Sequence, residues 1–245
     1  MHCQPSHKHQ VYIWLKSVQT CLICDERAES DDCVCNACET ELPWLMERCD
    51  VCALPLPMDG LVCGQCQKHP PAYQQVIAPW TYSFPVDSLI SRFKHQARWP
   101  LRHLLGRLLG RLLQHRFENA ELSRPDCLLP VPMPPKRLRQ RGYNQAVMLA
   151  RWLSANLDIP CDEHLLLRPQ ETVAQQDLDA KTRKRNLLNA FALAPGAWVQ
   201  GRHLALVDDV LTTGATAHSL ARLLMKAGAR QVDVYCLART PKPGT

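Results

Sequence analysis

Two adjacent carboxylates stand near the end of an apolar run, just before a turn rich in threonine and glycine. The carboxylates are Asp208 and Asp209, and the turn contains Thr212, Thr213, Gly214, Ala215 and Thr216. Successive backbone N–H groups in such a turn can hold an anion, and threonine hydroxyls add further donors. A helix that begins near Ala215 adds the positive end of its dipole, and Gly214 lets the backbone approach a phosphate closely. Because the carboxylates can accept hydrogen bonds from sugar hydroxyls, the pattern predicts a site for a phosphorylated sugar.

Thiol side chains offer a second kind of chemistry near the start of the chain. Of the 13 cysteines, ten lie in the first 66 residues. Eight of them form evenly spaced Cys-x-x-Cys pairs, namely Cys21/Cys24, Cys35/Cys38, Cys49/Cys52 and Cys63/Cys66. Each pair supplies two thiolates from one tight turn, and zinc takes four such ligands in a tetrahedron. We therefore expect two structural Zn²⁺ ions, most simply with the first two pairs holding one ion and the last two pairs the other.

Some alternatives for the thiols stay open at this point. An interleaved pairing would also give two four-thiolate sites, and free or redox-active thiols are the other interpretation. Cys3, Cys33 and His69 break the spacing and are expected not to be ligands. The metal module is either purely structural or a recognition element. Its many acidic side chains argue against a basic patch, so we do not expect it to bind DNA by itself.

The rest of the chain alternates predicted strands with predicted helices. Strands are expected at 75–83, 126–132, 164–169, 203–210 and 231–240, and helices at 86–97, 101–117, 142–157 and 216–229. This alternation predicts an α/β fold, a parallel sheet with helices on both faces. Ligands bind such sheets at the carboxyl ends of the strands, where Asp208 and Asp209 fall. We expect an N-terminal double zinc-ribbon module over residues 1–70 and a second domain over residues 71–245.

Composition narrows the class of protein without identifying it. The chain has 245 residues, of which 46% are hydrophobic, and a formal net charge of +6. The mild basic bias is compatible with partners that carry phosphate. No secretory signal is visible and no apolar run approaches the roughly 18–20 residues that cross a bilayer, so we expect no membrane span and a cytoplasmic location.

Two basic clusters follow predicted strands. The first contains Lys136, Arg137, Arg139 and Arg141, and the second spans residues 181–185. Cations at strand ends can offset the charge of a diphosphate, although both clusters can also be read as solvated basic loops. A further stripe of arginines on the predicted helix 101–117 is expected to be mostly solvated.

The segment ALVDDVLTTGAT resembles the phosphoribosyl pyrophosphate (PRPP) motif of the type I phosphoribosyltransferases, with Ala215 in place of a frequent second glycine. The segments 131–146 and 172–191, behind a Cys-x-x-Cys module, resemble the ComF/GntX family, which is associated with natural competence and with the use of external DNA as a nutrient. The resemblance runs over most of the chain, from Cys21 to Arg239. It implies a phosphoribosyltransferase-like fold.

The resemblance also implies roles for the motif residues. Asp208, Asp209 and residues 212–216 would bind PRPP with Mg²⁺. Lys136, Arg137, Arg139 and Arg141 would meet the pyrophosphate, and Arg183 would lie on a loop that closes over PRPP. Thr172, Gln175 and Asn186 also match the family pattern.

The sequence does not decide whether the protein catalyses phosphoribosyl transfer. A phosphoribosyltransferase would displace pyrophosphate at ribose C1, but no residue identifies the acceptor or a catalytic group. The alternative is a PRPP sensor without turnover, or an adaptor that handles single-stranded DNA and passes it to DNA-uptake or DNA-processing proteins.

Overall fold

The structure is a computed structural model that describes residues 20–28, 33–96, 99–169 and 190–242. Predictions for residues 170–189, Arg183 included, therefore lie outside the described residues. The elements, in chain order, are α1 Asn36–Thr40, α2 Gly64–Lys68, β1 Val76–Ile77, β2 Trp80–Thr81, α3 Val86–Gln96, α4 Trp99–Glu118, β3 Cys127–Pro130, α5 Pro135–Arg141, α6 Gln145–Leu157, β4 Leu166–Leu167, β5 Ala192–Leu193, β6 His203–Leu211, α8 Ala215–Lys226 and β7 Gln231–Arg239.

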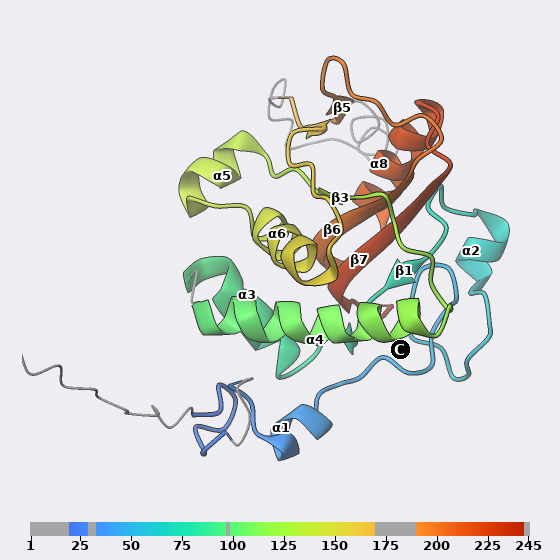
Figure 1. Cartoon of the computed structure of the whole chain (residues 1–245). Coiled ribbons are helices and arrows are strands. Elements are labelled where there is room, and N and C mark those ends of the chain that lie inside the picture. Colours follow the sequence, from blue (N-terminus) through green and yellow to red (C-terminus); the bar gives the residue numbers. More distant parts are fainter. Residues whose placement is uncertain (1–19, 29–32, 97–98, 170–189, 243–245) are drawn as a thin grey trace, which may run out of the picture.

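A parallel sheet forms the centre of the molecule, as the sequence predicts (Figure 1). Its strand order is β1-β7-β6-β3, and β2 also pairs with β7, beyond β1. The two long strands β6 and β7 pair from His203↔Gln231 to Leu211↔Arg239. At the edge, β3 pairs with β6 only as far as Pro130↔Val207. The strands β6 and β7 are therefore the longest in the sheet, and the pairing of β3 with β6 ends just before Asp208.

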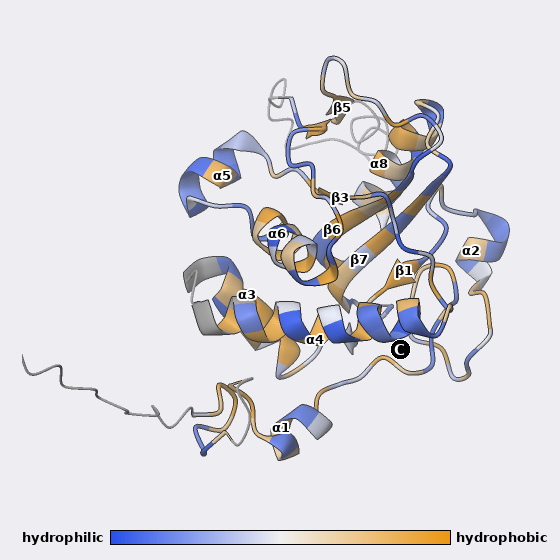
Figure 2. Cartoon of the chain, in the orientation of Figure 1, coloured by the Kyte–Doolittle hydropathy of each residue, from blue (hydrophilic) through white to orange (hydrophobic). Residues whose placement is uncertain are grey.

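Apolar side chains cover both faces of the sheet. Along β6, Ala205 and Val207 join the core formed with α3, α4 and α6, whereas Leu204 and Leu206 join the core formed with α8. This alternation follows from the two-residue period of a strand. In Figure 2, α4 alternates hydrophilic and hydrophobic stretches along its length, as expected for a helix with one buried side. The predicted sheet with helices on both faces is confirmed.

Helices α4 and α6 approach closely because glycine lines the contact. A Cβ added at Gly110 would lie 2.7 Å from Cζ3 of Trp152, and one at Gly106 would lie 3.0 Å from Cδ2 of the same ring. Real Cβ atoms essentially never come within 3.0 Å of carbon, so a side chain at Gly110 would force the ring of Trp152 to shift, and one at Gly106 would crowd the same ring. The spacing of these two glycines thus sets how near α6 can lie to α4.

Proline explains two differences between the predicted and the observed elements. The strand expected at 75–83 is split into β1 and β2, with Pro79 between them. The helix expected at 101–117 begins at Trp99, because Pro100 fits the first turn of a helix, where no N–H is needed.

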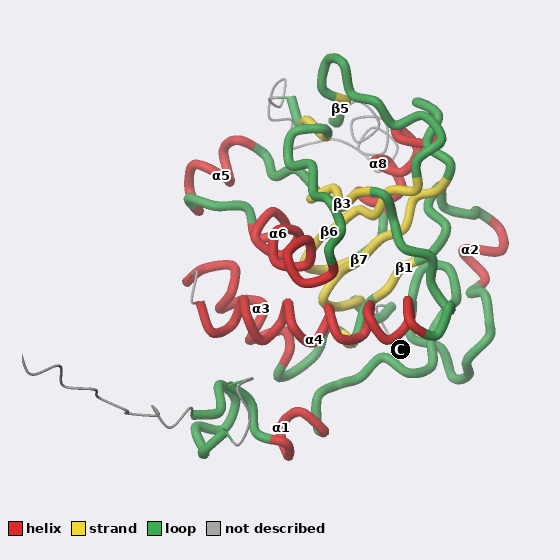
Figure 3. The backbone as a smooth tube through the Cα atoms, in the orientation of Figure 1, coloured by secondary structure: helices red, strands yellow, loops and turns green. Residues whose placement is uncertain are grey.

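Three further differences concern the edges of elements (Figure 3). The strand expected at 164–169 is only Leu166–Leu167, and it pairs antiparallel with β5 outside the main sheet. The helix expected at 142–157 begins at Gln145, where Asn144 caps it by accepting a hydrogen bond from the N–H of Ala146. The basic cluster expected as a loop contains a short helix, α5.

The cysteine-rich segment packs against the sheet at several points. The N–H of Leu45 donates to the carbonyl of Pro79 at 2.8 Å, and the N–H of Thr81 donates to the carbonyl of Pro43 at 2.9 Å. The rings of Trp44 and Trp80 lie 5.7 Å apart between centroids. Residues of the metal module are thereby in contact with the β2 edge of the sheet. The boundary at residue 70 stays a proposal.

Candidate functional site

The aspartate pair lies where β3 leaves β6. The last β3–β6 pair is Pro130↔Val207, and Asp208 and Asp209 follow directly on β6. The strand does not end at these carboxylates, because it continues to Leu211 beside β7. No described strand pairs with β6 at the aspartates on the side from which β3 has turned away, although Asp209 itself is buried. This is the position at which parallel sheets bind ligands.

The carboxylate of Asp209 is held by two other elements. Its Oδ2 lies 3.1 Å from Nζ of Lys94 on α3 and accepts a 2.7 Å hydrogen bond from Nε2 of Gln145 on α6. The amide oxygen of Gln145 accepts in turn from Nη1 of Arg141 at 2.7 Å. Asp209 is buried, so the nearby cation and the amide donor offset the cost of removing its charge from water.

Asp208 is in a different electrostatic state. It is only partly buried, and its Oδ1 accepts a hydrogen bond from the N–H of Asp209 at 2.8 Å. Burial, and then the neighbouring charge of Asp209, raise the pKa of Asp208 to about 7. The two carboxylates therefore differ at neutral pH, with Asp209 paired to a cation and Asp208 titrating.

The turn after β6 brings threonine hydroxyls to the start of α8. Gly214 precedes the helix with a φ of +75°, and the N–H of Ala215, at the start of α8, donates to Oγ1 of Thr213 at 3.4 Å. A side chain at this position would be strained, and its Cβ would lie 3.1 Å from the hydroxyl oxygen of Tyr73. Thr212, Thr213 and Ala215 are exposed and Thr216 is partly exposed. The N–H groups at the start of a helix and the nearby hydroxyls suit an anion.

The predicted basic residues do not all reach the aspartates. Lys136, Arg137 and Arg139 are exposed on α5, which stands apart from the sheet in Figure 1. Arg141, at the end of α5, is partly buried and joins the Asp209 network through Gln145. Arg141 is therefore linked to Asp209 through Gln145, whereas Lys136, Arg137 and Arg139 face solvent.

Two residues of this network have no role in the sequence prediction. Lys94 comes directly after the apolar residues of a predicted helix, where a solvated lysine is common. No sequence pattern therefore indicates that it contacts Asp209. Gln145 belongs to the family-like segment, but the pattern alone does not indicate that it binds Asp209.

The eight paired thiols form two groups of four. Cys21, Cys24, Cys35 and Cys38 make up the first group, and Cys49, Cys52, Cys63 and Cys66 the second, with all sulfur atoms of a group within 4.8 Å of one another. The Sγ atoms of Cys24 and Cys35 lie 3.8 Å apart, and those of Cys52 and Cys63 lie 3.7 Å apart. A tetrahedron with zinc–sulfur bonds of about 2.3 Å has edges of about 3.8 Å, so both groups fit zinc.

The grouping follows the order of the pairs along the chain and is not interleaved. Among the described residues, Cys33 and His69 belong to neither group, as expected. Although burial opposes it, backbone N–H groups of Cys35, Cys24 and Ile23 lower the pKa of the Cys21 thiol to about 6. Backbone donors around a thiol favour the thiolate that a metal needs.

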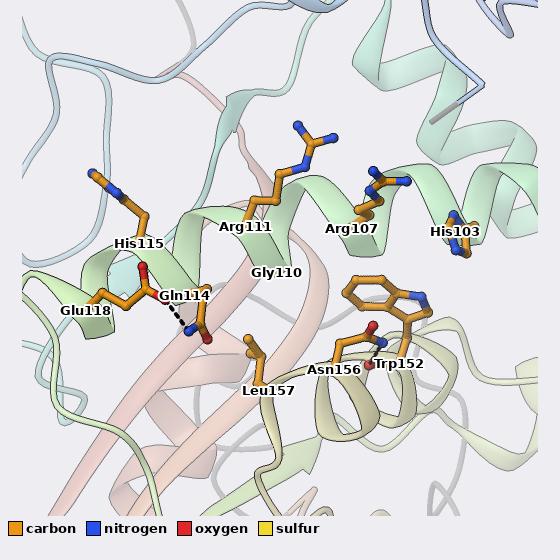
Figure 4. A pocket seen from close by; sticks show the side chains of 10 residues that line it. All are labelled: His103, Arg107, Gly110, Arg111, Gln114, His115, Glu118, Trp152, Asn156 and Leu157. Carbon is orange, nitrogen blue, oxygen red and sulfur yellow. Dashed lines mark hydrogen bonds between the residues drawn. The ribbon is translucent and has the colours of Figure 1, made fainter. Parts of the chain in front are cut away.

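A concave surface lies between α4 and α6 (Figure 4), and neither Asp208 nor Asp209 is among the residues that line it. Its volume is about 490 Å³, and its lining includes His103, Arg107, Arg111, Trp152 and Asn156. Trp152 extends from α6 against α4, and Arg111 pairs with Glu39 of the metal module at 3.3 Å.

Among the described helices, none is both long enough and apolar enough to cross a bilayer.

The unfolding free energy is expected to fall as the pH rises from about 5 to about 7. The folded protein keeps the proton of Asp208 up to a pH of about 7, whereas the unfolded chain loses it near the ordinary carboxyl pKa of about 4. The folded state therefore binds more protons over this interval, and its advantage is lost as the pH passes through about 7. Urea unfolding at several pH values measures the slope.

Two variants separate Asp208 from other titrating groups. Asp208→Asn is expected to remove the contribution of this residue to the slope. Glu163→Gln is the control, because its hydrogen bond with Arg151 lowers the pKa of Glu163 and it titrates below this interval. An unchanged slope in Asp208→Asn would contradict the raised pKa.

Comparison with known proteins gives matches over both parts of the chain. Residues 18–67 match a family model described as a double zinc ribbon domain. The DNA utilization protein YhgH of Escherichia coli strain K12 is 37% identical over 207 residues, which cover 84% of this chain and 90% of that protein. Competence protein F of Haemophilus influenzae is 36% identical over the same shares of the two chains, 84% and 90%. Among solved structures, the purine phosphoribosyltransferase from Pyrococcus horikoshii Ot3 is 18% identical, with a TM-score of 0.36, and the match covers 58% of this chain and 78% of that one.

Proposed function

Because the chain belongs to the family of DNA utilization protein YhgH and competence protein F, we propose that it is a PRPP-binding protein of the phosphoribosyltransferase type that acts in DNA uptake or in the use of external DNA as a nutrient. One observation supports PRPP as the ligand. The aspartate pair lies on the strand that leads directly into the start of α8, with Gly214 at positive φ between them. Carboxylates for a ribose and backbone donors for its phosphate then follow one another in a single strand–turn–helix unit.

Each part of PRPP has a proposed partner in this unit. The 5′-phosphate binds the turn from Thr212 to Thr216, and the ribose hydroxyls donate to the carboxylates. Asp208 meets the ribose first, because it is more exposed than Asp209, whose Oδ2 already accepts from Gln145 and contacts Lys94. Among the described residues that are predicted to meet the pyrophosphate, Arg141 bonds this network through Gln145.

Transfer, if the protein catalyses it, breaks the bond between ribose C1 and the pyrophosphate oxygen and forms a bond from C1 to an acceptor. Mg²⁺ that accompanies PRPP supplies positive charge to the leaving diphosphate. The chain's own contribution is to orient the ribose and to place cations of α5 beside the leaving group. Lys136, Arg137, Arg139 and Arg183 are proposed to reach it when the ligand is bound.

The alternative belongs to another class of protein, a PRPP sensor or an adaptor for single-stranded DNA. The groove between α4 and α6 favours the adaptor, because it combines Trp152 with cations of α4. Aromatic rings beside positive charge are the usual means of binding a single strand.

The two functions are separated by incubating the purified protein with PRPP, Mg²⁺ and a panel of bases while pyrophosphate release is followed. Calorimetry with PRPP and Mg²⁺ alone measures the affinity in parallel. Release that depends on one acceptor supports the transferase, and measurable affinity without release supports the sensor or adaptor. A protein that neither binds PRPP nor releases pyrophosphate contradicts the proposed ligand.

A further inference from the structure

The side chain of Arg239 connects the second group of cysteines to the turn after β6. Arg239 is the last residue of β7 and is 7% exposed. Its Nε donates to the carbonyl of Cys52 at 2.9 Å, and its Nη1 donates to the carbonyl of Leu211 at 3.2 Å and also to that of Thr212. A buried guanidinium is thus held by backbone carbonyls from two parts of the chain that lie far apart in sequence.

The segment that follows the second ribbon also contacts the turn and α8, through residues 72 and 73. Tyr73 belongs to the same buried cluster as the four cysteines of the second group, and its hydroxyl lies beside Gly214. The N–H of Ala72 donates to Nδ1 of His218 on α8 at 3.1 Å. The turn therefore contacts the second ribbon through Arg239, and the segment just after the ribbon through Tyr73.

The first group of cysteines contacts other elements. Cys21 lies in the cluster formed with α3 and α4. Nη1 of Arg92 on α3 donates to the carbonyl of Leu22 at 3.2 Å. An arginine thus joins each ribbon to the α/β part of the chain, but only Arg239 also bonds the turn after β6.

Arg239 helps to determine which way the donors of the turn point. In a trans peptide the C=O and the N–H point in opposite directions. The carbonyl of Leu211 also accepts from the N–H of Thr240 at 3.0 Å, so the pairing of β6 with β7 turns the N–H of Thr212 toward the other side of β6, where the proposed phosphate would lie. The carbonyl of Thr212 is turned toward Arg239, so the N–H of Thr213 must point away from Arg239.

We propose that Arg239 is a positioning residue for phosphate binding, which holds the turn in its binding shape by anchoring it to the metal-bound second ribbon. The proposal rests on the proposed function, since it concerns the same turn. It adds that the second ribbon, and not the first, supports ligand binding. Phosphate affinity thereby depends on a zinc site that does not touch the ligand.

The test compares two matched substitutions in the full-length, zinc-loaded protein. Arg239→Met removes the link to the second ribbon, and Arg92→Met removes the corresponding link to the first. We expect Arg239→Met to weaken ribose 5-phosphate and PRPP, measured by calorimetry, by at least about tenfold, from the loss of hydrogen bonds to a charged group. Arg92→Met is expected to stay within about twofold of the wild type.

Hydrogen exchange adds a readout that general destabilisation does not reproduce. In Arg239→Met the amides of residues 211–216 are expected to exchange faster, while those of α6 keep their wild-type rates. Zinc content is expected to remain two ions per chain, so that the effect is not one of metal loss. Cys52→Ser is expected to weaken ribose 5-phosphate as Arg239→Met does; if it fails to fold, the two arginine variants decide the question.

The outcomes separate this proposal from the proposed function. Wild-type protein that binds neither PRPP nor ribose 5-phosphate overturns the function and the coupling with it. Wild-type protein that binds both, together with an Arg239→Met variant of equal affinity, overturns the coupling alone. Equal weakening by Arg92→Met and Arg239→Met also overturns it, because the effect would then not be specific to the second ribbon.

Discussion

Replacing Asp208 and Asp209 together with asparagine is expected to abolish PRPP binding while the fold is retained. Each carboxylate is proposed to accept a hydrogen bond from a ribose hydroxyl, and a hydrogen bond to a charged group contributes about 1.5–3 kcal/mol. Losing two of them reduces the affinity by at least about 100-fold. Calorimetry with PRPP and Mg²⁺ measures the loss.

The fold should tolerate these changes for reasons visible at each position. Asparagine at 208 removes a carboxyl whose ionisation is opposed by burial. Asparagine at 209 leaves Lys94 without its carboxylate, but the lysine side chain is 24% exposed and can be hydrated. Asp87→Asn is the control, because Asp87 also lies on α3 but its carboxylate accepts hydrogen bonds from the N–H and the hydroxyl of its neighbour Ser88. Unchanged PRPP affinity in the double variant would mean that the ribose does not bind here.

Removing zinc is expected to cause the largest loss of stability. Elemental analysis should find about two zinc ions per chain, and a strong chelator should lower the Tm by more than about 10 °C. The thiols of the second group are themselves buried in the core that covers one face of the sheet, and Cys21 is buried in the core on the other. Without zinc, each group would consist of four thiolates that repel one another or four thiols with no metal between them. Either state would therefore disturb both cores.

A control variant tests whether the effect belongs to the two groups. Cys33→Ser changes a thiol that lies outside both clusters, and we expect it to keep two zinc ions and the wild-type response to the chelator. Protein purified without any zinc, but folded and equally resistant to heat, would rule out a structural role for the metal.

The parts of the site that are contiguous in sequence could be predicted from it. The strand–turn–helix unit around Asp208 and Gly214 is local, because its hydrogen-bonding groups belong to one short segment. The same holds for each Cys-x-x-Cys turn. The spacing of the pairs predicted sequential grouping as the simplest solution, and the positions of the sulfur atoms agree with it.

The partners of these residues could not be predicted in the same way. Gln145 reaches Asp209 across 64 positions, and Arg239 reaches Cys52 across 187. Such contacts depend on how α6 and β7 are placed against other elements, which no local pattern of residue types describes. The short helix α5 was also not predicted, because exposed cations are equally common in helices and loops.

The sequence by itself determined which residues can bind a phosphate, a ribose or zinc, since those abilities belong to side chains and to short stretches of backbone. The tertiary structure decided which of them act together. Packing of α3 and α6 brings Lys94 and Gln145 to Asp209, pairing of β7 with β6 brings Arg239 beside Leu211, and packing of the second ribbon brings the carbonyl of Cys52 to Arg239. Burial of apolar surface drives that packing, and the position of each polar partner follows from it.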